Sequence, residues 1–422
     1  MSRPRGLPGW ADRPLVWQIF QLAEQAGGEA RLVGGAVRDW LAGELAEEMT
    51  GGMAGGMAGE LAEGMAGGMA GGQQPDLDMA ATVPPQIMAA AAANAGLAVY
   101  ETGLAHGTIT LKDHRDSIEL TQARRDTRTD GRHAEIQPTN DWAEDAGRRD
   151  FTVNAIYLDR DGQLFDPCGG QADLAAGRLR FIGAADHRLA EDYLRLLRGF
   201  RLAAEKGLRL DAPALAAMQQ ALPGLAGLSA ERITAEMRRW LEAAGGLAML
   251  AEAASIGLDR ALFGHAWQLP GDADFYHRLD WLARLVLICG PEGDLAACDR
   301  LRFSRAERGR LHQLGQPLAK AELAELAGPG WQQAAYWLAE AGARLVVTCL
   351  WQDAPLPDPA RLAQIEAFRK PAFPLVGADL LAAGLSEGPA LGRRLKELER
   401  DWVRGGFAAS RADLLVQVKN SE

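Results

Sequence analysis

The sequence predicts an α+β protein, in which a head with a small mixed β-sheet and flanking helices precedes an all-α neck, body and tail. Short apolar runs suited to strands gather in the first 121 residues. From Asp166 onward, alanine- and leucine-rich helical patterns dominate, with breaks at glycine and proline clusters. A length of 422 residues also exceeds one ordinary domain. The expected parts are a head over 1–156, a neck over 157–240, and a body and tail over 241–422.

The elements of the head follow from periodicity and from turn residues. Apolar residues at helical spacing predict three helices, and the last of them opens with two prolines suited to a first turn. Apolar and polar residues alternate in the segments between and after these helices, which predicts strands. The predicted helices cover 15–26, 36–45 and 83–96, and the predicted strands cover 31–33, 98–100, 106–112 and 117–121.

Residues 49–72 repeat Met-Ala-Gly-Gly with variants. Glycine at this density does not hold regular structure, so we expect a flexible insertion between the second helix and the next strand. Such an insertion costs little, because loop-closure entropy grows only logarithmically with length. The alternative is a methionine-rich contact for RNA or for a protein partner.

The composition of the chain argues against several classes of function. The net charge of −11 argues against binding nucleic acid by bulk charge, so any RNA contact must use local basic patches. The four cysteines are scattered without a Cys-x-x-Cys pair, which predicts reduced thiols and a cytoplasmic protein. No run of 18 apolar residues occurs, so we expect no membrane span. The sequence indicates no protein partner and no oligomeric state.

Two aspartates follow a glycine pair in the head. If Asp76 and Asp78 lie on a strand, their carboxylates point to one face, where mutual repulsion favours a bound cation such as Mg²⁺. Gly34 and Gly35 precede a predicted helix, so their backbone N–H groups can approach phosphate, and Arg38 projects from the first turn. Each feature alone is commonly a simple turn.

Two further motifs follow in order, 148–155 (RRDFTVNA) and 191–201 (EDYLRLLRGFR). The ordered set resembles the class II tRNA nucleotidyltransferases, the CCA-adding enzymes and bacterial poly(A) polymerases of the polymerase β superfamily. The resemblance covers about half of the chain, roughly Arg31 to Gly207. It implies transfer of nucleotides to an RNA 3′-hydroxyl without a nucleic-acid template.

The resemblance also assigns roles to residues. Asp76 and Asp78 are expected to be the catalytic carboxylates that hold two Mg²⁺ ions on the primer hydroxyl and the triphosphate. The nucleotide is expected to contact Gly34, Gly35, Arg38 and Arg149. Glu119 lies on a predicted strand that could run beside the aspartates, so it is either a third carboxylate of this site or a solvent-facing glutamate.

Asp192 and Arg195 suggest how bases are chosen. The two residues are three positions apart on a predicted helix, so their side chains are neighbours that present a hydrogen-bond acceptor beside a donor. The alternative is a surface ion pair. Cytosine and adenine match this pattern, whereas uracil and guanine leave buried groups unpaired at a cost of about 1–3 kcal/mol each. Arg198 and Arg201 continue the three-residue steps toward the ribose and triphosphate. The resemblance gives Asp192 and Arg195 the same roles.

The polar segment 124–135 predicts a mobile loop. It matches the loop that full CCA-adding members use when specificity switches from C to A, so the resemblance implies addition of all three nucleotides from CTP and ATP. A poly(A) polymerase, a CC- or A-adding partial enzyme and a silent tRNA-binding module are the alternatives.

Two arginine-rich runs in the helical half are candidates for contact with the tRNA whose 3′ end is extended. At helical spacing, each run places several guanidiniums on one face, where they suit RNA phosphates. A solvated helix face is the alternative. The residues singled out are Arg302, Arg305, Arg393 and Arg394.

Overall fold

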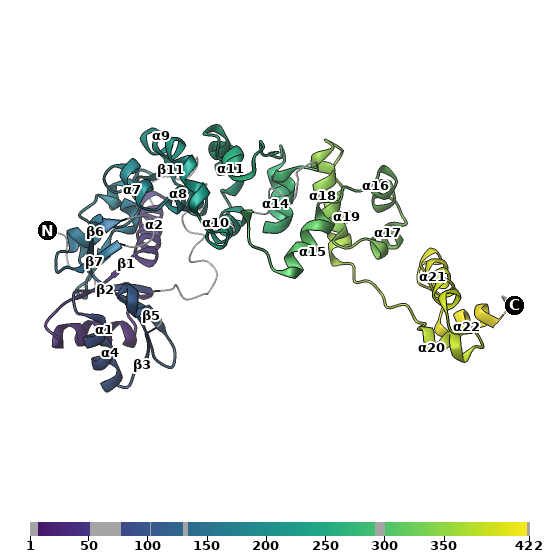
Figure 1. The fold of residues 1–422 in the computed structure, drawn as a ribbon, viewed down its shortest axis with the longest axis horizontal. Helices are drawn as coiled ribbons and strands as arrows, with labels where there is room; N and C mark the ends of the chain where they lie inside the picture. The colour runs from purple at the N-terminus through teal and green to yellow at the C-terminus, as the bar shows by residue number, and fades with distance from the viewer. Residues whose placement is uncertain (1–6, 51–76, 102, 130–133, 292–299, 420–422) are drawn as a thin grey trace. The chain divides into compact units, whose positions relative to one another are not determined.

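The computed structural model describes residues 7–50, 77–101, 103–129, 134–291 and 300–419. The chain forms two compact units (Figure 1). The first comprises Met1–Ala266 with Arg300–Arg302, and the second comprises Trp267–Asp299 with Phe303–Glu422. The first unit therefore holds the predicted head and neck together with the following two helices, α11 (Gly246–Ser255) and α12 (Leu258–Phe263).

The head is built on a seven-stranded mixed sheet, which confirms the predicted fold class. Its strand order is β3-β4-β5-β2-β1-β8-β9, and only β2 and β5 are parallel neighbours. The last two strands lie beyond residue 156, the predicted end of the head, so the sheet continues into the next segment. The strands are β1 (Ala30–Val33), β2 (Leu77–Ala81), β3 (Ala98–Tyr100), β4 (Thr108–Lys112), β5 (Ser117–Gln122), β8 (Tyr157–Leu158) and β9 (Leu164–Phe165).

Alternation along the strands separates an apolar face from a polar face. In β2, Leu77 and Met79 are buried while Asp78 is exposed, and in β5 Ile118 is buried while Glu119 is exposed. The helices α1 (Pro14–Gln25) and α4 (Pro85–Asn94) contact each other, and they pack on the sheet through β1 and through β3 to β5 (Figure 1). The apolar positions thus fix which face carries the carboxylates.

The segment predicted as a loop is mostly a hairpin. Strand β6 (Arg124–Thr129) pairs antiparallel with β7 (Ala134–Pro138), and the register shifts between Asp126 and Arg128. The loop prediction was wrong for these strands, because backbone pairing stabilises a polar ribbon that lacks an apolar signal. The tip, residues 130–133, lies outside the described residues.

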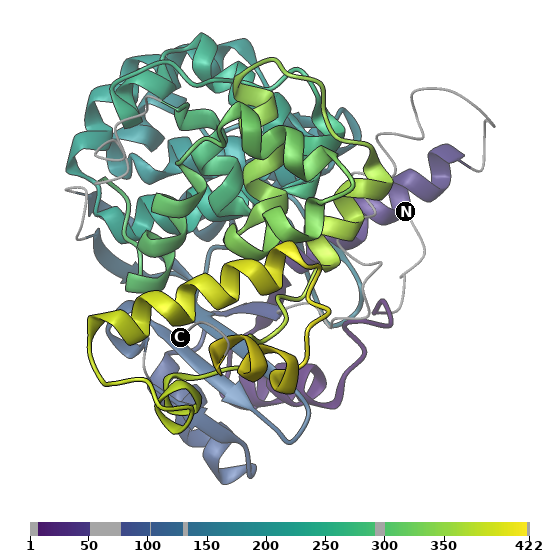
Figure 2. The ribbon, with the colours of Figure 1, turned by 90° about the vertical axis from the view of Figure 1, so that its right-hand side faces the viewer.

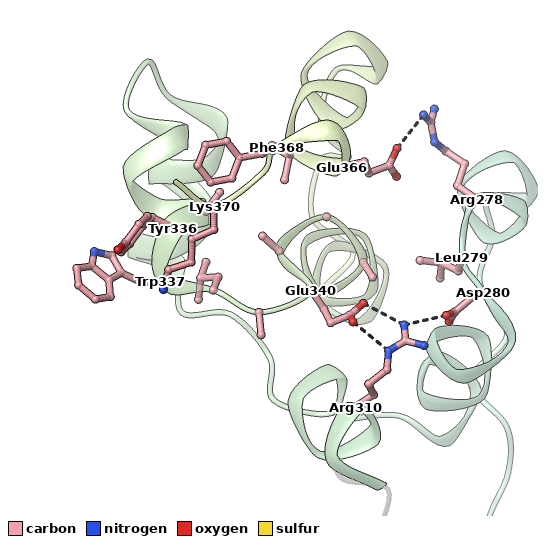
Figure 3. A pocket seen from close by; sticks show the side chains of 17 residues that line it. Arg278, Leu279, Asp280, Arg310, Tyr336, Trp337, Glu340, Glu366, Phe368 and Lys370 are labelled. Atoms are coloured by element: carbon pink, nitrogen blue, oxygen red, sulfur yellow. Dashed lines mark hydrogen bonds and ion pairs between the residues drawn. The ribbon is translucent and has the colours of Figure 1, made fainter. Parts of the chain in front are cut away.

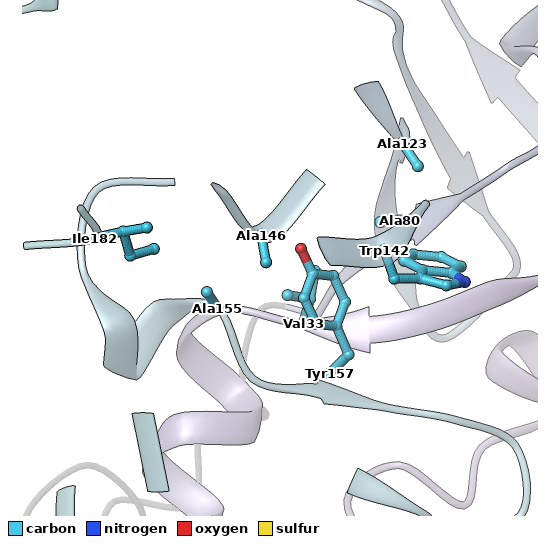
Figure 4. Packing of buried hydrophobic residues seen from close by; sticks show 8 residues of the cluster. All are labelled: Val33, Ala80, Ala123, Trp142, Ala146, Ala155, Tyr157 and Ile182. Atoms are coloured by element: carbon cyan, nitrogen blue, oxygen red, sulfur yellow. The ribbon is translucent and has the colours of Figure 1, made fainter. Parts of the chain in front are cut away.

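A small apolar cluster joins the sheet to the segment that follows the hairpin (Figure 4). Trp142, which opens α5 (Trp142–Gly147), meets Tyr157 of β8 edge to face, with ring centroids 5.5 Å apart. Val33 of β1 and Ala80 of β2 belong to the same cluster. This core holds Tyr157 directly beneath the arginines described below.

Helix α2 (Gly35–Thr50) follows β1 and runs two residues into the predicted insertion; residues 51–76 of the insertion region lie outside the described part of the chain. In the neck, α8 (Leu194–Lys206) packs on α10 (Ala230–Glu242), and Phe200 stacks on Trp240 at 5.2 Å. Gly207 ends α8 in the left-handed region (φ 61°), a conformation that favours glycine at a helix end.

The neck also contains α6 (Gly170–Ala175), α7 (Ala185–Glu191), α9 (Ala212–Ala221) and a short 3-10 helix, η3 (Leu222–Gly227). Four short strands depart from the all-α prediction for 157–240: β8 and β9 belong to the head sheet, and Arg178–Leu179 (β10) and Arg209–Leu210 (β11) form a two-residue parallel ladder.

The described elements of the second unit are all helices, as predicted (Figures 1 and 2). Helices begin or end at the predicted breaks, for example Pro329-Gly330 before α17. None of the described helices combines the length and the apolar character needed to cross a bilayer. The helices are α13 (Ala273–Arg278), α14 (Trp281–Cys289), α15 (Arg305–Leu314), α16 (Lys320–Ala327), α17 (Trp331–Trp337), α18 (Ala341–Trp351), α19 (Pro359–Ala367), α20 (Gly377–Ala382), α21 (Pro389–Arg404) and α22 (Arg411–Lys419).

Candidate active site

A cavity of about 510 Å³ in the first unit gathers nearly all of the predicted site residues. It lies where the β1–α2 turn, β2, the segment 149–154, α8 and α10 come together. Seven arginines and four carboxylates line it, so a local excess of positive charge faces the ligand although the whole chain is acidic. The predicted residues that line it are Gly34, Gly35, Arg38, Asp78, Arg149, Asp192, Arg195, Arg198 and Arg201.

The glycine pair brings backbone close to the carboxylate strand. Gly34 adopts φ +84°, a left-handed conformation that a side chain strains, and its carbonyl accepts the Arg38 N–H at 3.1 Å. A Cβ placed on Gly34 would lie 3.4 Å from Asp78 Oδ2. A Cβ placed on Gly35 would lie 3.6 Å from Arg38 Nη2. The turn therefore sits between the β2 carboxylate and the arginine that opens α2.

Two of the predicted carboxylates lie at paired positions on the exposed face of the sheet. Asp78 pairs in register with Glu119 across the parallel strands β2 and β5, and both side chains are on the exposed face. Carboxylate oxygens are ligands that hard cations prefer. Two negative charges at neighbouring positions repel each other, so they favour a bound cation. Asp76 lies outside the described residues. Within the described ranges, no group of three or more histidine, cysteine, aspartate or glutamate side chains is placed to hold a metal.

Arg38 is buried and held in place by polar partners. Its Nε and Nη2 lie 2.8 Å from Asp39 Oδ1, and its Nη1 donates to Asn154 Oδ1 at 2.6 Å. Asp39 in turn accepts from Lys206 at 3.0 Å, at the end of α8. Arg38 thus links α2 to the 152–154 turn while one edge of its guanidinium lines the cavity.

Arg149 is positioned by a buried carboxylate and a phenol. Its Nε donates to Tyr157 Oη at 3.0 Å and its Nη2 to Asp145 Oδ2 at 3.2 Å. Burial favours the neutral form of Asp145, but the charges of Arg149 and Arg148 and the Tyr157 hydrogen bond outweigh it, so the pKa of Asp145 is lowered. Asp145 Oδ1 also accepts the Arg124 N–H at 3.1 Å, which ties the start of β6 to this group.

Asp150 and Arg198 join the head to α8 inside the cavity. Both Nε and Nη2 of Arg198 donate to Asp150 Oδ2, at 2.9 and 2.7 Å. Burial opposes ionisation of Asp150, yet Arg198 and the Asn154 hydrogen bond prevail and lower its pKa. Asp150, which belongs to the motif 148–155, thus holds an arginine that was predicted to bind nucleotide.

The predicted helical spacing of Asp192 and Arg195 was wrong. Asp192 follows α7 with extended backbone (φ −156°, ψ 103°), and α8 begins only at Leu194. A polar side chain that hydrogen-bonds nearby backbone favours such a break, and Asp192 Oδ1 accepts the Leu194 N–H at 3.1 Å. Asp192 and Arg195 still line the same cavity, from the break and from the first turn of α8.

Both residues have protein partners. Asp192 Oδ2 accepts from Arg232 Nη2 at 2.6 Å. Arg195 bonds the Glu191 carboxylate and donates to the Arg188 carbonyl at 2.9 Å. The carboxyl of Glu191 is partly desolvated, which opposes ionisation, but Arg195 and Arg188 outweigh this and lower its pKa.

Arg201 lies deepest of the predicted arginines on α8 and is largely enclosed by protein. Its Nε bonds Glu236 of α10, and its Nη1 donates to Glu205 at 2.6 Å. Arg239 also donates to Glu205, at 3.0 Å. This network fastens α8 to α10, so the main contacts of Arg201 are with carboxylates of the protein.

Three charged residues of the cavity wall lie outside the recognised motifs and were not predicted: Glu205, Arg232 and Arg239. Arg232 and Arg239 lie on α10, which α9 and η3 separate from the recognised motifs. Their signal is that α10 is apolar on one side and carries basic residues on the other. That pattern does not indicate which helix packs against α10. Arg232 and Arg239 can therefore be assigned to the cavity only from the observed packing of α10 on α8.

The four arginines predicted to bind RNA lie in different places. Arg302 belongs to the first unit, where its backbone N–H donates to Thr234 Oγ1 at 2.7 Å. The others belong to the second unit: Arg305 opens α15 and is exposed, and Arg393 is exposed on α21. Arg394 donates to the Gln417 carbonyl at 3.2 Å.

The second unit contains a larger cavity, about 670 Å³, with none of the predicted active-site residues (Figure 3). Arg310 pairs with both Glu340, at 2.9 Å, and Asp280, at 2.8 Å. Arg278 lies 3.4 Å from Glu366, and Lys370 packs over the Tyr336 ring. Three cationic and three anionic side chains balance each other here, so we assign the chemistry to the arginine-rich cavity of the first unit.

Comparisons with known proteins agree with this geometry. The model of the poly(A) polymerase head domain family matches residues 30–180. CCA tRNA nucleotidyltransferase 1, mitochondrial, from Homo sapiens is 31% identical over 96% of this chain and 89% of its own length. The Danio rerio protein of the same name is 30% identical over 93% of this chain and 88% of its own length.

Solved structures share the whole fold. The CCA-adding enzyme of Bacillus stearothermophilus, in complex with CTP, superposes with a TM-score of 0.73 at 22% identity over 98% of each chain. The Thermotoga maritima enzyme, complexed with tRNA, gives a TM-score of 0.65 at 18% identity over 98% of this chain and 97% of its own.

The head sheet, its exposed carboxylates and the arginine-lined cavity define a nucleotidyltransferase of the polymerase β superfamily. The similarity to the human and fish proteins extends over nearly the full chain. The chain belongs to the CCA tRNA nucleotidyltransferase family.

Proposed function

We propose that this chain adds the 3′-terminal CCA to tRNA from CTP and ATP without a nucleic-acid template. One observation carries the proposal: a single cavity is lined by the glycine turn, the carboxylate of β2, an array of arginines and the Asp192–Arg195 pair. A triphosphate needs the first three features, and the choice of a base needs the fourth.

In the proposed reaction, the 3′-hydroxyl oxygen of the RNA attacks the α-phosphorus of the nucleotide. The new P–O bond forms as the bond to the β-phosphate oxygen breaks, and pyrophosphate leaves. Arg38, Arg149 and Arg198 are charged side chains that hold the triphosphate and offset the negative charge that develops on it.

We assign Mg²⁺ as the metal, held by Asp78 and Asp76 with Glu119 as a third carboxylate. Supporting this, Asp78 and Glu119 are adjacent on the exposed face of the sheet and offer only oxygen ligands. When bound, the ion polarises the α-phosphate and makes the attacking hydroxyl more acidic. Omission of divalent cation should abolish incorporation, and Mg²⁺ should restore it more fully than Ca²⁺.

Asp192 and Arg195 are proposed to read the base. A carboxylate oxygen accepts the exocyclic amino group of cytosine or adenine, and the guanidinium donates to the adjacent ring nitrogen. Because Arg195 bonds the Glu191 carboxylate and the Arg188 carbonyl, the base must share or replace one of these contacts. A tRNA lacking its 3′ CCA, incubated with each nucleoside triphosphate in turn, should accept only C and A.

The same assay separates the alternatives. Products from this tRNA should end in CCA, whereas an unstructured oligo(A) should remain unextended. Long A tails on the oligo would indicate a poly(A) polymerase, and products that stop after CC, or that gain A only on tRNA already ending in CC, would indicate a partial enzyme. Binding of tRNA without any incorporation would indicate a silent module.

The tRNA is proposed to contact Arg302, Arg305 and Arg393, which are exposed, together with Arg394. The division into head, neck, and body with tail remains our prediction for how the chain separates catalysis from tRNA binding. We also retain the cytoplasmic location as a proposal: Cys168 and Cys349 are free thiols, although the human and fish relatives are named as mitochondrial.

A further inference from the structure

The exposed face of the head sheet continues past the two carboxylates to the edge strand β3. Strand register sets one residue from each of four strands in a single row across this face, and the row consists of Asp78, Glu119, Thr110 and Tyr100. Paired residues project from the same face of a sheet. Tyr100, at the outer end of the row, is 51% exposed. A half-exposed aromatic ring therefore lies on the face that carries the proposed metal ligands.

We propose that the outer part of this face, formed by β3 and β4, holds the 3′ end of the acceptor RNA, and that Tyr100 stacks on one of its last two bases. This inference rests on the proposed function of the cavity. Lys112 supports it, because the residue is exposed and lies two positions after Thr110 in β4, so it projects from the same face. Its positive charge attracts RNA phosphates, although the chain as a whole is acidic.

The position of the nucleotide cavity decides from which side the RNA arrives. The cavity reaches Asp78 from the side of β1, where the glycine turn and Arg38 lie, and its arginines are proposed to hold the triphosphate. In phosphoryl transfer, the attacking and leaving oxygens lie roughly in line on opposite sides of the phosphorus. Pyrophosphate leaves toward the arginines, so the RNA 3′-hydroxyl approaches from the side of β5, β4 and β3. Strands are about 4.8 Å apart, which places Tyr100 about 14 Å from Asp78 along the sheet.

Stacking suits an RNA end whose identity changes during the proposed reaction. Each added C or A becomes the new terminal base, so a subsite that reads base edges by hydrogen bonds would fit only some of the steps. Every base has an aromatic face, and stacking on a protein ring accepts any of them. Tyr100 therefore supplies the kind of contact that a subsite for successive RNA ends needs.

Two other roles for Tyr100 give different expectations. A single exposed aromatic residue is common on protein surfaces and need not bind anything. Alternatively, β3 is an edge strand, whose unpaired backbone groups could pair with a second copy of the chain. Under the first role, Tyr100 has no effect on RNA, and under the second it changes the oligomeric state instead.

The experiment measures kcat/KM for a tRNA lacking its 3′ CCA, and KM for CTP, with the full-length protein and its Tyr100→Ala and Tyr100→Phe variants. Tyr100→Ala should lower kcat/KM for tRNA by about tenfold and leave KM for CTP unchanged, because one base loses its stacking partner. Tyr100→Phe keeps the ring and should match the wild type. Ile87→Ala is the matched control, since Ile87 is 50% exposed on α4, which packs on the apolar face of the sheet.

A change in the substrate tests the contact directly. Removal of the base from the last or the next-to-last RNA nucleotide should lower kcat/KM for the wild type, and at one of these positions the loss should not add to that of Tyr100→Ala. Additive losses at both positions would overturn the stacking role. An unchanged kcat/KM for Tyr100→Ala would also overturn it, whether or not sedimentation shows a changed oligomeric state.

A binding measurement without nucleotide keeps this inference separate from the proposed function. The fluorescence of 2-aminopurine falls when the base stacks, so wild type and Tyr100→Phe should quench this probe at one of the last two RNA positions, and Tyr100→Ala should not. Thermal unfolding confirms that each variant is folded. Equal quenching by all variants would contradict the RNA subsite even if the wild type adds CCA. Wild-type protein that adds neither C nor A to tRNA would instead overturn the proposed function.

Discussion

Asp78 and Glu119 occupy paired positions on the parallel strands β2 and β5, and both side chains are on the exposed face of the sheet. The burial of Met79 and Leu120 at the next positions fixes this face, because a slip of one residue would bury both carboxylates. The pairing shows that the strand of Glu119 runs beside the strand of Asp78, and it makes Glu119 a neighbour of the proposed metal site.

The first prediction compares these two carboxylates. Asp78→Asn should lower nucleotide incorporation by at least about 100-fold, because an amide is a poor ligand for a divalent ion. Glu119→Gln should lower it less, by about tenfold, and should raise the Mg²⁺ concentration needed for half-maximal rate. Rates across a Mg²⁺ titration, with tRNA binding as the control, test both. Full activity of Asp78→Asn would remove the assigned metal role.

The second prediction concerns the glycine turn. Gly34→Ala should cost about 1–2 kcal/mol of stability, because φ +84° is strained for alanine. Its added Cβ would lie 3.4 Å from Asp78 Oδ2, so incorporation should fall as well. Gly43→Ala is the control: a Cβ there meets nothing within 4 Å, and a helical alanine should stabilise by about 0.5–1 kcal/mol. Denaturant unfolding together with incorporation rates distinguishes the two positions.

Local signals were sufficient to predict most of the head. Alternation in 117–121 and the apolar run at 31–33 predicted strands that the structure confirms, since half-buried strands show their pattern directly. The site residues could be placed together only through the resemblance, since they come from segments far apart in the sequence.

The remaining features depend on contacts that leave no local pattern. The break at Asp192 interrupts a segment that otherwise shows a helical pattern, and it is stabilised partly by Arg232, forty positions away. The β6–β7 hairpin is polar on both strands, so its pairing had no apolar signal. Arg201 was predicted to face the ligand, but Glu236 on another helix bonds it.

The third prediction follows from that buried pair. Arg201→Met should cost about 3–5 kcal/mol, because it leaves the buried Glu236 carboxylate without its cationic partner. The double variant Arg201→Met with Glu236→Gln should recover part of the loss, with a coupling of about 1–3 kcal/mol. Urea unfolding of the four proteins in the cycle gives this coupling. Additive losses would show that the two side chains do not act as a pair.

The fourth prediction concerns acid stability. Asp145 is fully buried and bonded to Arg148, Arg149 and Tyr157, which hold its pKa below the ordinary value of 3.8 despite burial. A carboxylate whose pKa is lower in the folded state stabilises the protein above the unfolded value. That stabilisation is lost as pH falls through the lower, folded value. The Asp145 contribution should therefore be constant from pH 7 to 5 and should decline below about pH 4.

Asp145→Asn tests this directly, since it keeps the shape and removes the charge. The variant should unfold with about 3–5 kcal/mol less free energy at pH 7, because two partly buried arginines lose their carboxylate. The gap to the wild type should narrow between pH 4 and 3. Asp141→Asn is the control: Asp141 caps α5 by accepting the Ala143 N–H, and asparagine caps equally well. Urea unfolding at pH 7, 5, 4 and 3 measures each gap, and a gap for Asp145→Asn that widens in acid would contradict the lowered pKa.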